Sequence, residues 1–270
     1  MDRLEAGVSG SGGEFRKHAR IIWALLMREL NTRYGRNNIG YLWVIAEPLV
    51  FAGGVSLLWT FIKPPYEHGI KLVPFVVTGY MPLILVRQTV SWAVSAVKVN
   101  QSLLYHRQIT PLHLFIARIG LEFVGVSLAF ITIVFVLAVV GIMPLPKSIL
   151  GLRLIFGGWF MLAWMSAGLA LILAALGEIF EFVERFIQVI TYVLIPLSGA
   201  FFMAAWLPAA ARNMILVLPF IHCFEMIRGG FFGEYLTIYY NVPYTLAWCA
   251  GFSLVGLLLV QVVRDRVEIE

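Results

Sequence analysis

The chain has 270 residues, of which 60% are hydrophobic and only 13% are charged, and its mean hydropathy is +0.87. This number of charges is too small to cover the surface of a soluble globule of this length. The composition therefore excludes a soluble domain and indicates an integral membrane protein. A net charge of +5 could indicate nucleic-acid binding, but basic residues gathered on one side of a membrane would mark orientation instead.

The residues before the first apolar run are polar and basic. Residues 1–13 contain the stretch GVSGSGG and are predicted to form a flexible tail. Over residues 14–38, apolar side chains such as Phe15, Ile22 and Leu26 recur on one helical face, with basic side chains opposite. This pattern predicts an amphipathic helix that lies in the membrane interface, with its cations toward anionic headgroups.

Six apolar segments follow, each of about the 20 residues that a helix needs to cross a bilayer. They predict an all-α membrane domain over residues 39–270. The third segment is long enough to tilt. The spans are predicted at about 40–62, 74–97, 112–142, 152–177, 186–206 and 244–264.

The basic residues outside these spans set the orientation. With six spans, both termini and the loops 98–111 and 178–185 lie on one side of the membrane. That side carries twelve Lys and Arg residues, whereas the other side carries six. Because cytoplasmic segments are enriched in Lys and Arg, both termini are predicted to lie in the cytoplasm.

Residues 207–240 are apolar but interrupted by prolines and glycines, including Pro208, Pro219 and Gly229. The segment is too irregular for one further span. Irregular backbone at membrane depth must be sheltered by protein or line a wet cavity. We therefore expect two re-entrant half-helices in the outer leaflet, between the fifth and sixth spans.

Charged residues occur inside the predicted spans. Arg118 and Glu122 are four residues apart, so they share a helix face and are predicted to form an intramembrane pair, with either a structural or a coupling role. Glu47 precedes Pro48, which removes a helical hydrogen bond, so Glu47 is predicted to face a pore or to reach the inner interface. Arg87 has no acidic partner in its own span. It is therefore predicted to pair with an acidic residue on another helix or with a phosphate.

Catalytic motifs are absent from the sequence, which has no HExxH, no GxSxG and no Asp-rich metal motif. The stretch GIMPLPKS, residues 141–148, has the length of a phosphate-binding loop, but Pro146 replaces the glycine whose amide would hold phosphate. Cys223 and Cys249 lack metal or redox spacing and are interpreted as packing residues. The chain is therefore predicted to be no enzyme and to bind no metal or cofactor itself.

Three stretches carry a family resemblance. RELNTRYGRNNIGYLWVIAEPL, residues 28–49, resembles the opening of the permease subunits of ABC-2 type polysaccharide exporters. The family pattern is an Arg-Glu pair, Arg-Tyr, Leu-Gly, Trp and Pro, and Ile39 stands here for the usual Leu. Residues 105–123 and 218–230 are similar to the capsular polysaccharide branch, although Leu218 stands where that branch usually has Asn. The matching positions in these two stretches are Arg107, Pro111, Arg118, Glu122, Pro219, His222, Glu225 and Arg228.

The resemblance implies a transport subunit of the bacterial inner membrane that exports a lipid-linked, acidic capsular polysaccharide. It implies a homodimer of this chain that works with two copies of a separate P-loop ATPase, which would bind ATP and Mg. A periplasmic adaptor or co-polymerase and an outer-membrane channel are further implied partners, and nucleic acid is not one.

The resemblance also assigns roles at the cytoplasmic side. The segment 98–111 would be the coupling helix that docks on the ATPase, with Arg107 and Pro111 as its marked positions; the alternative is a plain polar loop. The cytoplasmic mouth would attract the anionic head of a lipid anchor. The residues assigned to that mouth are Arg28, Arg33, Tyr34 and Arg36.

A substrate path between two protomers would pass aromatic residues, because rings offer sliding contact to sugar faces. Interfacial belts are the alternative role for such residues. On the outer side, His222, Glu225 and Arg228 share one helical face, where they would contact a lipid headgroup or an acidic glycan, or form an internal clamp. The candidate path residues are Trp43, Glu47, Phe51, Trp59, Tyr192, Phe201 and Phe202.

Other functions are left open by the residues. An exporter of O-antigen or teichoic acid polymer would share the same features. An ATP-independent channel or ion-driven transporter should show internal repeats with paired broken helices, and the two halves show none. An intramembrane glycolipid enzyme would need the metal or acid–base motifs that are missing.

Overall fold

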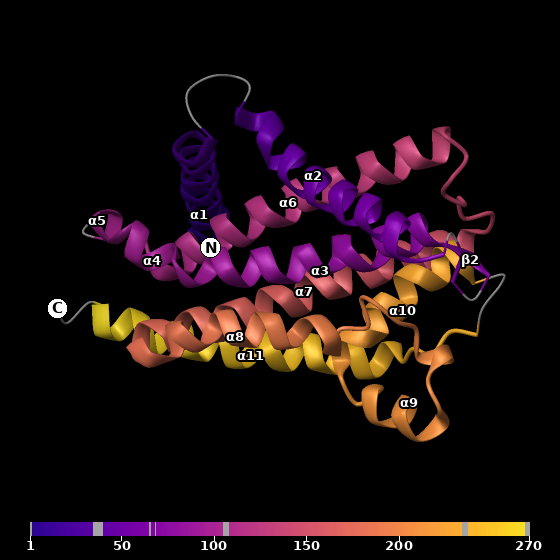
Figure 1. Ribbon diagram of the computed structural model, residues 1–270. Coiled ribbons are helices and arrows are strands. Elements are labelled where there is room, and N and C mark those ends of the chain that lie inside the picture. Colours follow the sequence, from indigo (N-terminus) through magenta and orange to yellow (C-terminus); the bar gives the residue numbers. More distant parts are fainter. Residues whose placement is uncertain are drawn as a thin grey trace.

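The computed structural model describes residues 2–34, 40–64, 66–67, 69–104, 108–233 and 237–267, and these ranges are almost entirely helical (Figure 1). Along the chain the elements are α1 (Asp2–Tyr34), α2 (Gly40–Ile62), β1 (Tyr66–Glu67), β2 (Ile70–Lys71), α3 (Leu72–Val94), α4 (Ala96–Val99), α5 (Gln101–Leu104), α6 (Pro111–Val139), α7 (Ile149–Ile179), α8 (Glu181–Leu197), η1 (Ala204–Trp206), α9 (Ala209–Ile215), α10 (Pro219–Phe232) and α11 (Val242–Val267). β1 and β2 form a short antiparallel hairpin.

Five of the described helices are long and apolar enough to cross a membrane, namely α2, α3, α6, α7 and α11. The predicted span 40–62 has the same bounds as α2, and the ends of the other four helices lie within three residues of the predicted ends. The all-helical membrane fold is therefore confirmed.

The fifth predicted span, 186–206, is the one whose bounds differ most from those of the helix found in the structure. The corresponding helix, α8, is shorter and ends at Leu197, and Gly199 adopts a left-handed φ of 81° in the turn that follows. Its 17 residues extend about 25 Å, less than the hydrocarbon thickness of about 30 Å. The chain then continues through irregular backbone and η1.

The neighbours of α8 nevertheless require it to cross. Helices α7 and α11 lie side by side and parallel, because Trp164 donates to Ser253 and, further along, Leu171 packs against Gly256. Both helices therefore end at the same face of the bundle. Between the end of α7 and the start of α11 the chain must therefore run back to the opposite face of the bundle. Helix α8 is the segment that does so (Figure 1).

The described part of the segment between α8 and α11 contains a bent helix pair, as two half-helices would, and its place in the outer leaflet stays a prediction. α9 and α10 meet at an angle of 109°, so they form a bent pair rather than one straight span. All residues of α10 are buried, between α7, α3 and α11. This burial satisfies the requirement that interrupted backbone at membrane depth be enclosed by protein.

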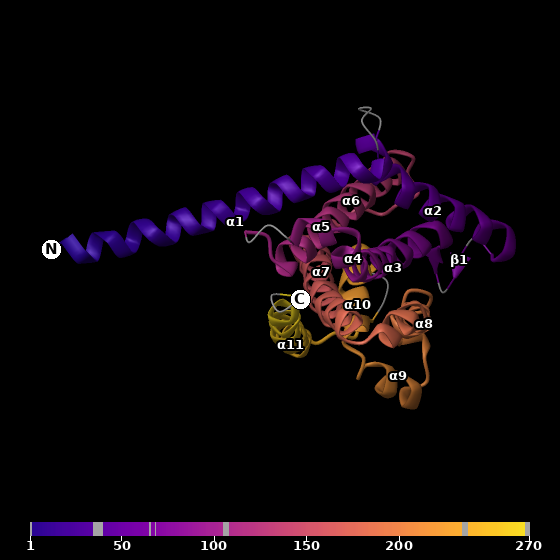
Figure 2. The same cartoon turned by 90° about the vertical axis from the view of Figure 1, so that its left-hand side faces the viewer.

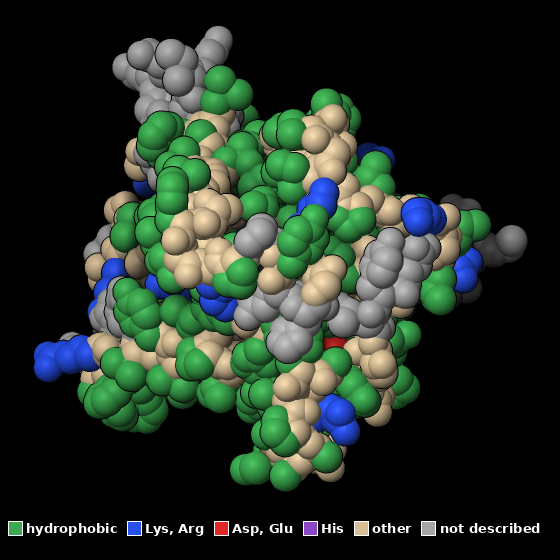
Figure 3. Space-filling view, turned by 45° about the vertical axis from the view of Figure 1, so that its right-hand side comes forward, with side chains coloured by type: hydrophobic (Ala, Val, Ile, Leu, Met, Phe, Trp, Pro, Cys, Tyr) green, Lys and Arg blue, Asp and Glu red, His purple; other side chains and the backbone are tan. Residues whose placement is uncertain are grey.

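Helix α3 is the centre of the bundle. In its span 78% of the residues are buried, against 17% in α2 and 22% in α11. At its outer half, Phe75 and Met81 belong to a core cluster with Trp159 and Phe224, and its inner end joins a second cluster around Phe115. On the face seen in Figure 3, hydrophobic side chains far outnumber charged ones, as a membrane domain requires.

Helix α1 is partly separate from this bundle. Its N-terminal half projects away, whereas its C-terminal half packs along α6 (Figure 2). Leu25 is buried there, while Phe15 and Trp23 are exposed. The helix begins at Asp2, so it also includes most of the segment that the sequence predicts as a tail, and the boundary between tail and amphipathic helix stays a prediction.

Candidate functional site

A cavity of about 240 Å³ opens between α2 and α3, and we call it the lateral groove. Helices α2 and α8 lie on the same side of α3 (Figure 2). Ionisable residues at membrane depth face protein or water rather than lipid, so this polar groove marks a sheltered or wet side of the domain. The lateral groove is lined by Glu47, Phe51, Tyr80, Ile84, Arg87, Gln88, Ser91 and Trp92.

Arg87 is the cation of the lateral groove. Its guanidinium carbon lies 4.9 Å from the ring centroid of Tyr192 on α8, which is a cation–π contact. Its Nε is buried and has no hydrogen-bond partner among the residues that the structure describes. Guanidinium groups bind carboxylates and phosphates through paired N–H groups, so Arg87 is suited to an anionic group, while Glu47 places a carboxylate in the same lining.

The structure brings some predicted path residues together and separates others. Glu47 and Phe51 line the lateral groove, and Tyr192 covers its arginine. Trp59 stacks on Phe201 with ring centroids 5.3 Å apart. Trp43 lies on α2 outside the groove and is 56% exposed. Phe202 is half-buried, and its role in the path stays a prediction.

At the cytoplasmic end, the Arg28-Glu29 pair of α1 contacts two other elements, and we call these contacts the inner junction. Arg28 Nη1 donates to Asn100 Oδ1 at 2.8 Å, between α4 and α5. Glu29 Oε1 lies 3.0 Å from Arg118 Nη2 on α6. Both side chains of that ion pair are largely buried, so α1 is tied both to the predicted coupling segment and to a span.

Arg118 extends the inner junction to α3. Its Nη1 donates at 3.4 Å to the carbonyl of Trp92 and to the hydroxyl of Ser95, at the end of that helix. Glu122 is buried one turn along α6 from Arg118, on the same face. The pair predicted between Arg118 and Glu122 stays a prediction, and the ion pair with Glu29 is a contact that it did not include.

The C-terminal end of the predicted coupling segment, at Pro111, coincides with the start of a helix. Pro111 is the first residue of α6, where Thr110 and His113 form a capping box. His113 Nε2 in turn lies 2.8 Å from His18 Nδ1 on α1. Of the other predicted residues on this side, Arg36 and Arg107 lie outside the described residues, and so do the side chains of Arg33 and Tyr34.

On the outer side, Arg228 is fully buried in the protein. Its guanidinium donates to the carbonyls of Gly199, Ala200 and Phe202, and the contacts to Gly199 and Phe202 are 2.6 Å long. The guanidinium carbon also lies 4.1 Å from the ring centroid of Phe75. These bonds satisfy carbonyls that the irregular backbone after α8 leaves without helical partners.

Glu225 and His222 bind backbone on both sides of α10. Glu225 accepts from the amides of Ala204 and Tyr239, at 2.9 and 3.1 Å. His222 contacts the carbonyl of Leu216 and accepts from the amide of Asn241. These bonds favour the internal clamp among the three predicted roles, and we call His222, Glu225 and Arg228 the outer clamp.

The sequence reasoning left Arg87, Glu29 and Asn100 out of its candidate site residues. Arg87 could have been found from the sequence, since it is a charged residue inside a predicted span and has no acidic residue near it in that span. Glu29 had a signal as well, because it follows Arg28 in the Arg-Glu pair of the family motif. Asn100 had no local signal, because its partner Arg28 is 72 residues away.

The chain was compared with known proteins. Residues 20–232 match the family model described as ABC-2 type transporter. The capsule polysaccharide export inner-membrane protein CtrC of Neisseria meningitidis is 36% identical over 249 residues, which are 92% of this chain and 93% of the relative. BexB of Haemophilus influenzae, with the same description, is 35% identical over the same shares. The polysialic acid transport protein KpsM of Escherichia coli is 26% identical over 83% of this chain and 87% of the relative.

Proposed function

The chain belongs to the ABC-2 type transporter family, and on this premise we propose that it exports a lipid-linked, acidic capsular polysaccharide across the bacterial inner membrane. It is a multi-pass transport subunit of that membrane. The names of its relatives, which describe capsule polysaccharide export and polysialic acid transport, support the substrate class.

The observation that supports an acidic substrate is the position of Arg87 in the lateral groove. An arginine inside a span is costly unless it has a partner, and its cost is offset where it binds an anion. The Tyr192 ring holds the guanidinium on one face, and Arg87 lines the groove, where its guanidinium would bind a carboxylate or phosphate. A polymer that carries such groups at intervals could then move past the groove.

A second copy of the chain would enclose the path. The flanking helices α2 and α8 both expose large apolar side chains, such as Val50 and Leu57 on α2 and Phe186 and Val193 on α8. In a homodimer these faces would meet around the lateral grooves. The path would then be bounded by protein on every side, and its polar lining would be kept from lipid.

Membership of the family implies an ATPase partner for this chain. We propose two copies of that ATPase, which bind ATP and Mg in place of this chain, together with a periplasmic adaptor and an outer-membrane channel. Movement of the 98–111 segment would pull on Asn100, and hence on Arg28 and α1. The Glu29–Arg118 pair would carry the same movement to α6.

The test of this function is an Arg87→Gln variant in cells that make the polymer. Loss of the guanidinium should lower surface polymer by at least about tenfold, because one charge-assisted bond contributes about 1.5–3 kcal/mol. Polymer should then accumulate in the cytoplasm. Lys71→Gln removes an exposed cation of β2 that donates to the carbonyl of Gly141, away from the groove, and serves as the control. Normal surface polymer in Arg87→Gln would contradict the role of the groove.

The polymer itself is identified in the same experiment. Chemical analysis of the material that accumulates distinguishes an acidic capsular polysaccharide from O-antigen or teichoic acid. A neutral polymer would contradict the acidic substrate even if export failed.

A further inference from the structure

A second cavity, of about 680 Å³, lies between the end of α9 and the start of α11, and we call it the outer pocket. This end of the bundle is opposite to the one that holds α4 and α5 (Figure 1). Its volume is within the range of roughly 300–1,000 Å³ that is typical of small-ligand pockets. Among the described residues, no Asp, Glu or Lys lines it. The polar residues of its lining are Asn213, His222, Tyr239, Tyr240, Asn241 and Tyr244.

Hydrogen bonds within the chain hold the walls of the outer pocket. The hydroxyl of Tyr244 donates to the carbonyl of Val217 at 2.6 Å, and the amide of Tyr244 donates to Asn241 Oδ1 at 3.1 Å. Nδ1 of His222, in the outer clamp, accepts from the amide of Asn241 at 3.2 Å. These bonds tie the start of α11 to the loop before α10 and to α10 itself. The pocket is therefore preformed, and a ligand would not have to order it.

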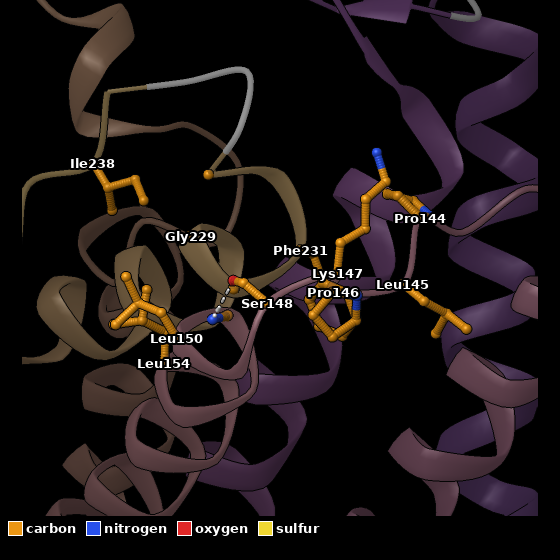
Figure 4. A pocket seen from close by; sticks show the side chains of 13 residues that line it. Pro144, Leu145, Pro146, Lys147, Ser148, Leu150, Leu154, Gly229, Phe231 and Ile238 are labelled. Carbon is orange, nitrogen blue, oxygen red and sulfur yellow. Dashed lines mark hydrogen bonds between the residues drawn. The ribbon is translucent and has the colours of Figure 1, made fainter.

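Ile238 fixes the segment that carries Tyr239 and Tyr240. Its side chain fills the space over Gly229 of α10, where a Cβ atom would lie 2.5 Å from Ile238 Cδ1. Ile238 and Gly229 also line a smaller cavity of about 230 Å³, between α10 and residues 144–148 (Figure 4). Ile238 is thus a wall shared by two cavities, and of the two only the outer pocket is lined by tyrosines.

Other polar groups of the outer pocket are directed to no partner among the described residues. The side chain of Asn213 and Nδ2 of Asn241 form no hydrogen bond there, and both residues are exposed. Tyr240 is 40% exposed, and its ring contacts no other ring in the described part of the chain. Amides donate and accept hydrogen bonds, while ring faces pack against C–H groups. This set matches a sugar unit, which presents hydroxyls at its edge and C–H groups on its face.

A cation lies beside the outer pocket. The guanidinium carbon of Arg212 is 4.6 Å from the ring centroid of Tyr239, which lines the pocket. A guanidinium forms strong, charge-assisted hydrogen bonds to carboxylate or phosphate. Since no carboxylate lines the pocket within the described residues, the charge of Arg212 favours a sugar that carries an anionic group.

We propose that the outer pocket binds one acidic sugar unit of the polysaccharide as it leaves the domain. This inference rests on the proposed function and on the predicted outward orientation of this end. The face of the sugar packs against Tyr240, and its anionic group pairs with Arg212. Its hydroxyls bond to the amides of Asn213 and Asn241. The pocket holds the polymer beyond the lateral groove and so opposes its backward movement.

Isothermal titration calorimetry on the full chain, purified with its ATPase, tests the site. The probe is an oligosaccharide released by mild hydrolysis from the capsule of the same cells. Tyr240→Ala should weaken its binding by about fivefold, the effect of losing one packed ring. Tyr66→Ala removes an exposed tyrosine of β1 that does not line the pocket, and it should leave binding unchanged. Equal affinities of these two variants would overturn the proposal and leave the tyrosines as interfacial anchors.

A second pair of variants tests the recognition of charge. Arg212→Gln should weaken binding of the oligosaccharide by about tenfold, because a charge-assisted hydrogen bond is lost. Lys71→Gln, which removes an exposed cation of β2 that donates to the carbonyl of Gly141, should not weaken it. Unchanged affinity in Arg212→Gln would refute an acidic sugar at this site.

The outer pocket and the proposed function fail in different measurements. Each titration is repeated in an Arg87→Gln background, where the lateral groove has lost its cation and the outer pocket should still bind the oligosaccharide. If Arg87→Gln stops export but Tyr240→Ala retains full affinity, only the outer pocket is refuted. If Tyr240→Ala loses affinity but Arg87→Gln exports normally, the outer pocket is supported and only the role of the groove is refuted.

Discussion

At the residue scale, the arginines at membrane depth differ in what their guanidinium groups contact. Arg228 donates to three backbone carbonyls, and Arg118 pairs with Glu29. Arg87 instead lines the lateral groove, and its Nε is buried without a hydrogen-bond partner among the described residues. Since burying a charge is costly without a partner, the first two are bound by the protein itself, and Arg87 is the one suited to a ligand.

Arg228→Met should destabilise the outer clamp. The substitution leaves three carbonyls of the turn after α8 without their donors, and breaking a buried charged network costs about 3–5 kcal/mol. We expect a lower midpoint of thermal unfolding for the protein in detergent. Arg212→Met, which removes a less buried arginine over the Tyr239 ring, should change the midpoint much less. Equal midpoints for the two variants would show that the clamp does not stabilise the fold.

At the element scale, α1 is more than an interfacial anchor. It bonds to Asn100 of the predicted coupling segment through Arg28, and to α6 through Glu29. Arg118 then reaches the end of α3, the most buried span and one wall of the lateral groove. The inner junction thus connects the cytoplasmic surface with the groove through contiguous contacts.

Glu29→Gln should uncouple ATP hydrolysis from export. Arg118 would keep its charge but lose the Glu29 carboxylate, so this ion pair would no longer transmit movement of α1 to α6. We expect ATPase activity of the purified complex to persist while surface polymer falls at least about tenfold, the effect of losing a partly buried pair. Glu14→Gln, an exposed change on the same helix, is the control. Full export by Glu29→Gln would refute transmission through this pair.

At the scale of the whole molecule, the parallel packing of α7 and α11 decides the topology. Because both helices run the same way, the short helix α8 must carry the chain back across the membrane. The re-entrant pair α9 and α10 then enters and leaves on the outer side. This packing supports the predicted six crossings, and the distribution of basic residues predicts that both termini are cytoplasmic.

Cysteine labelling in intact cells tests this topology. Both native cysteines are buried, so added cysteines can be labelled selectively. An impermeant maleimide should label Leu145→Cys and Val217→Cys, which are exposed at the outer end. It should label Phe180→Cys, in the exposed turn between α7 and α8, only after the cells are opened. Labelling of Phe180→Cys from outside would refute the crossing by α8.

Much of the fold was predictable because it depends on local composition. Apolar runs of spanning length must be helices in hydrocarbon, where every backbone group needs an internal partner, and a prolonged interruption such as residues 207–240 must be sheltered. The ends of α8 were not predictable in this way. The residues after Leu197 are still apolar, and it is the left-handed turn at Gly199, held by Arg228, that ends the helix.

The site was predictable only in its parts. Residue type and depth indicate that Glu47, Arg87 and Tyr192 need a polar setting, but nothing local shows that Tyr192 covers Arg87 from a helix 105 residues further on. Likewise, the spacing of Arg118 and Glu122 predicts a pair on one helix, while the spacing does not indicate the ion pair that Arg118 forms with Glu29 of α1. Local patterns follow from helix geometry and solvent, whereas contacts between distant residues depend on how the helices pack.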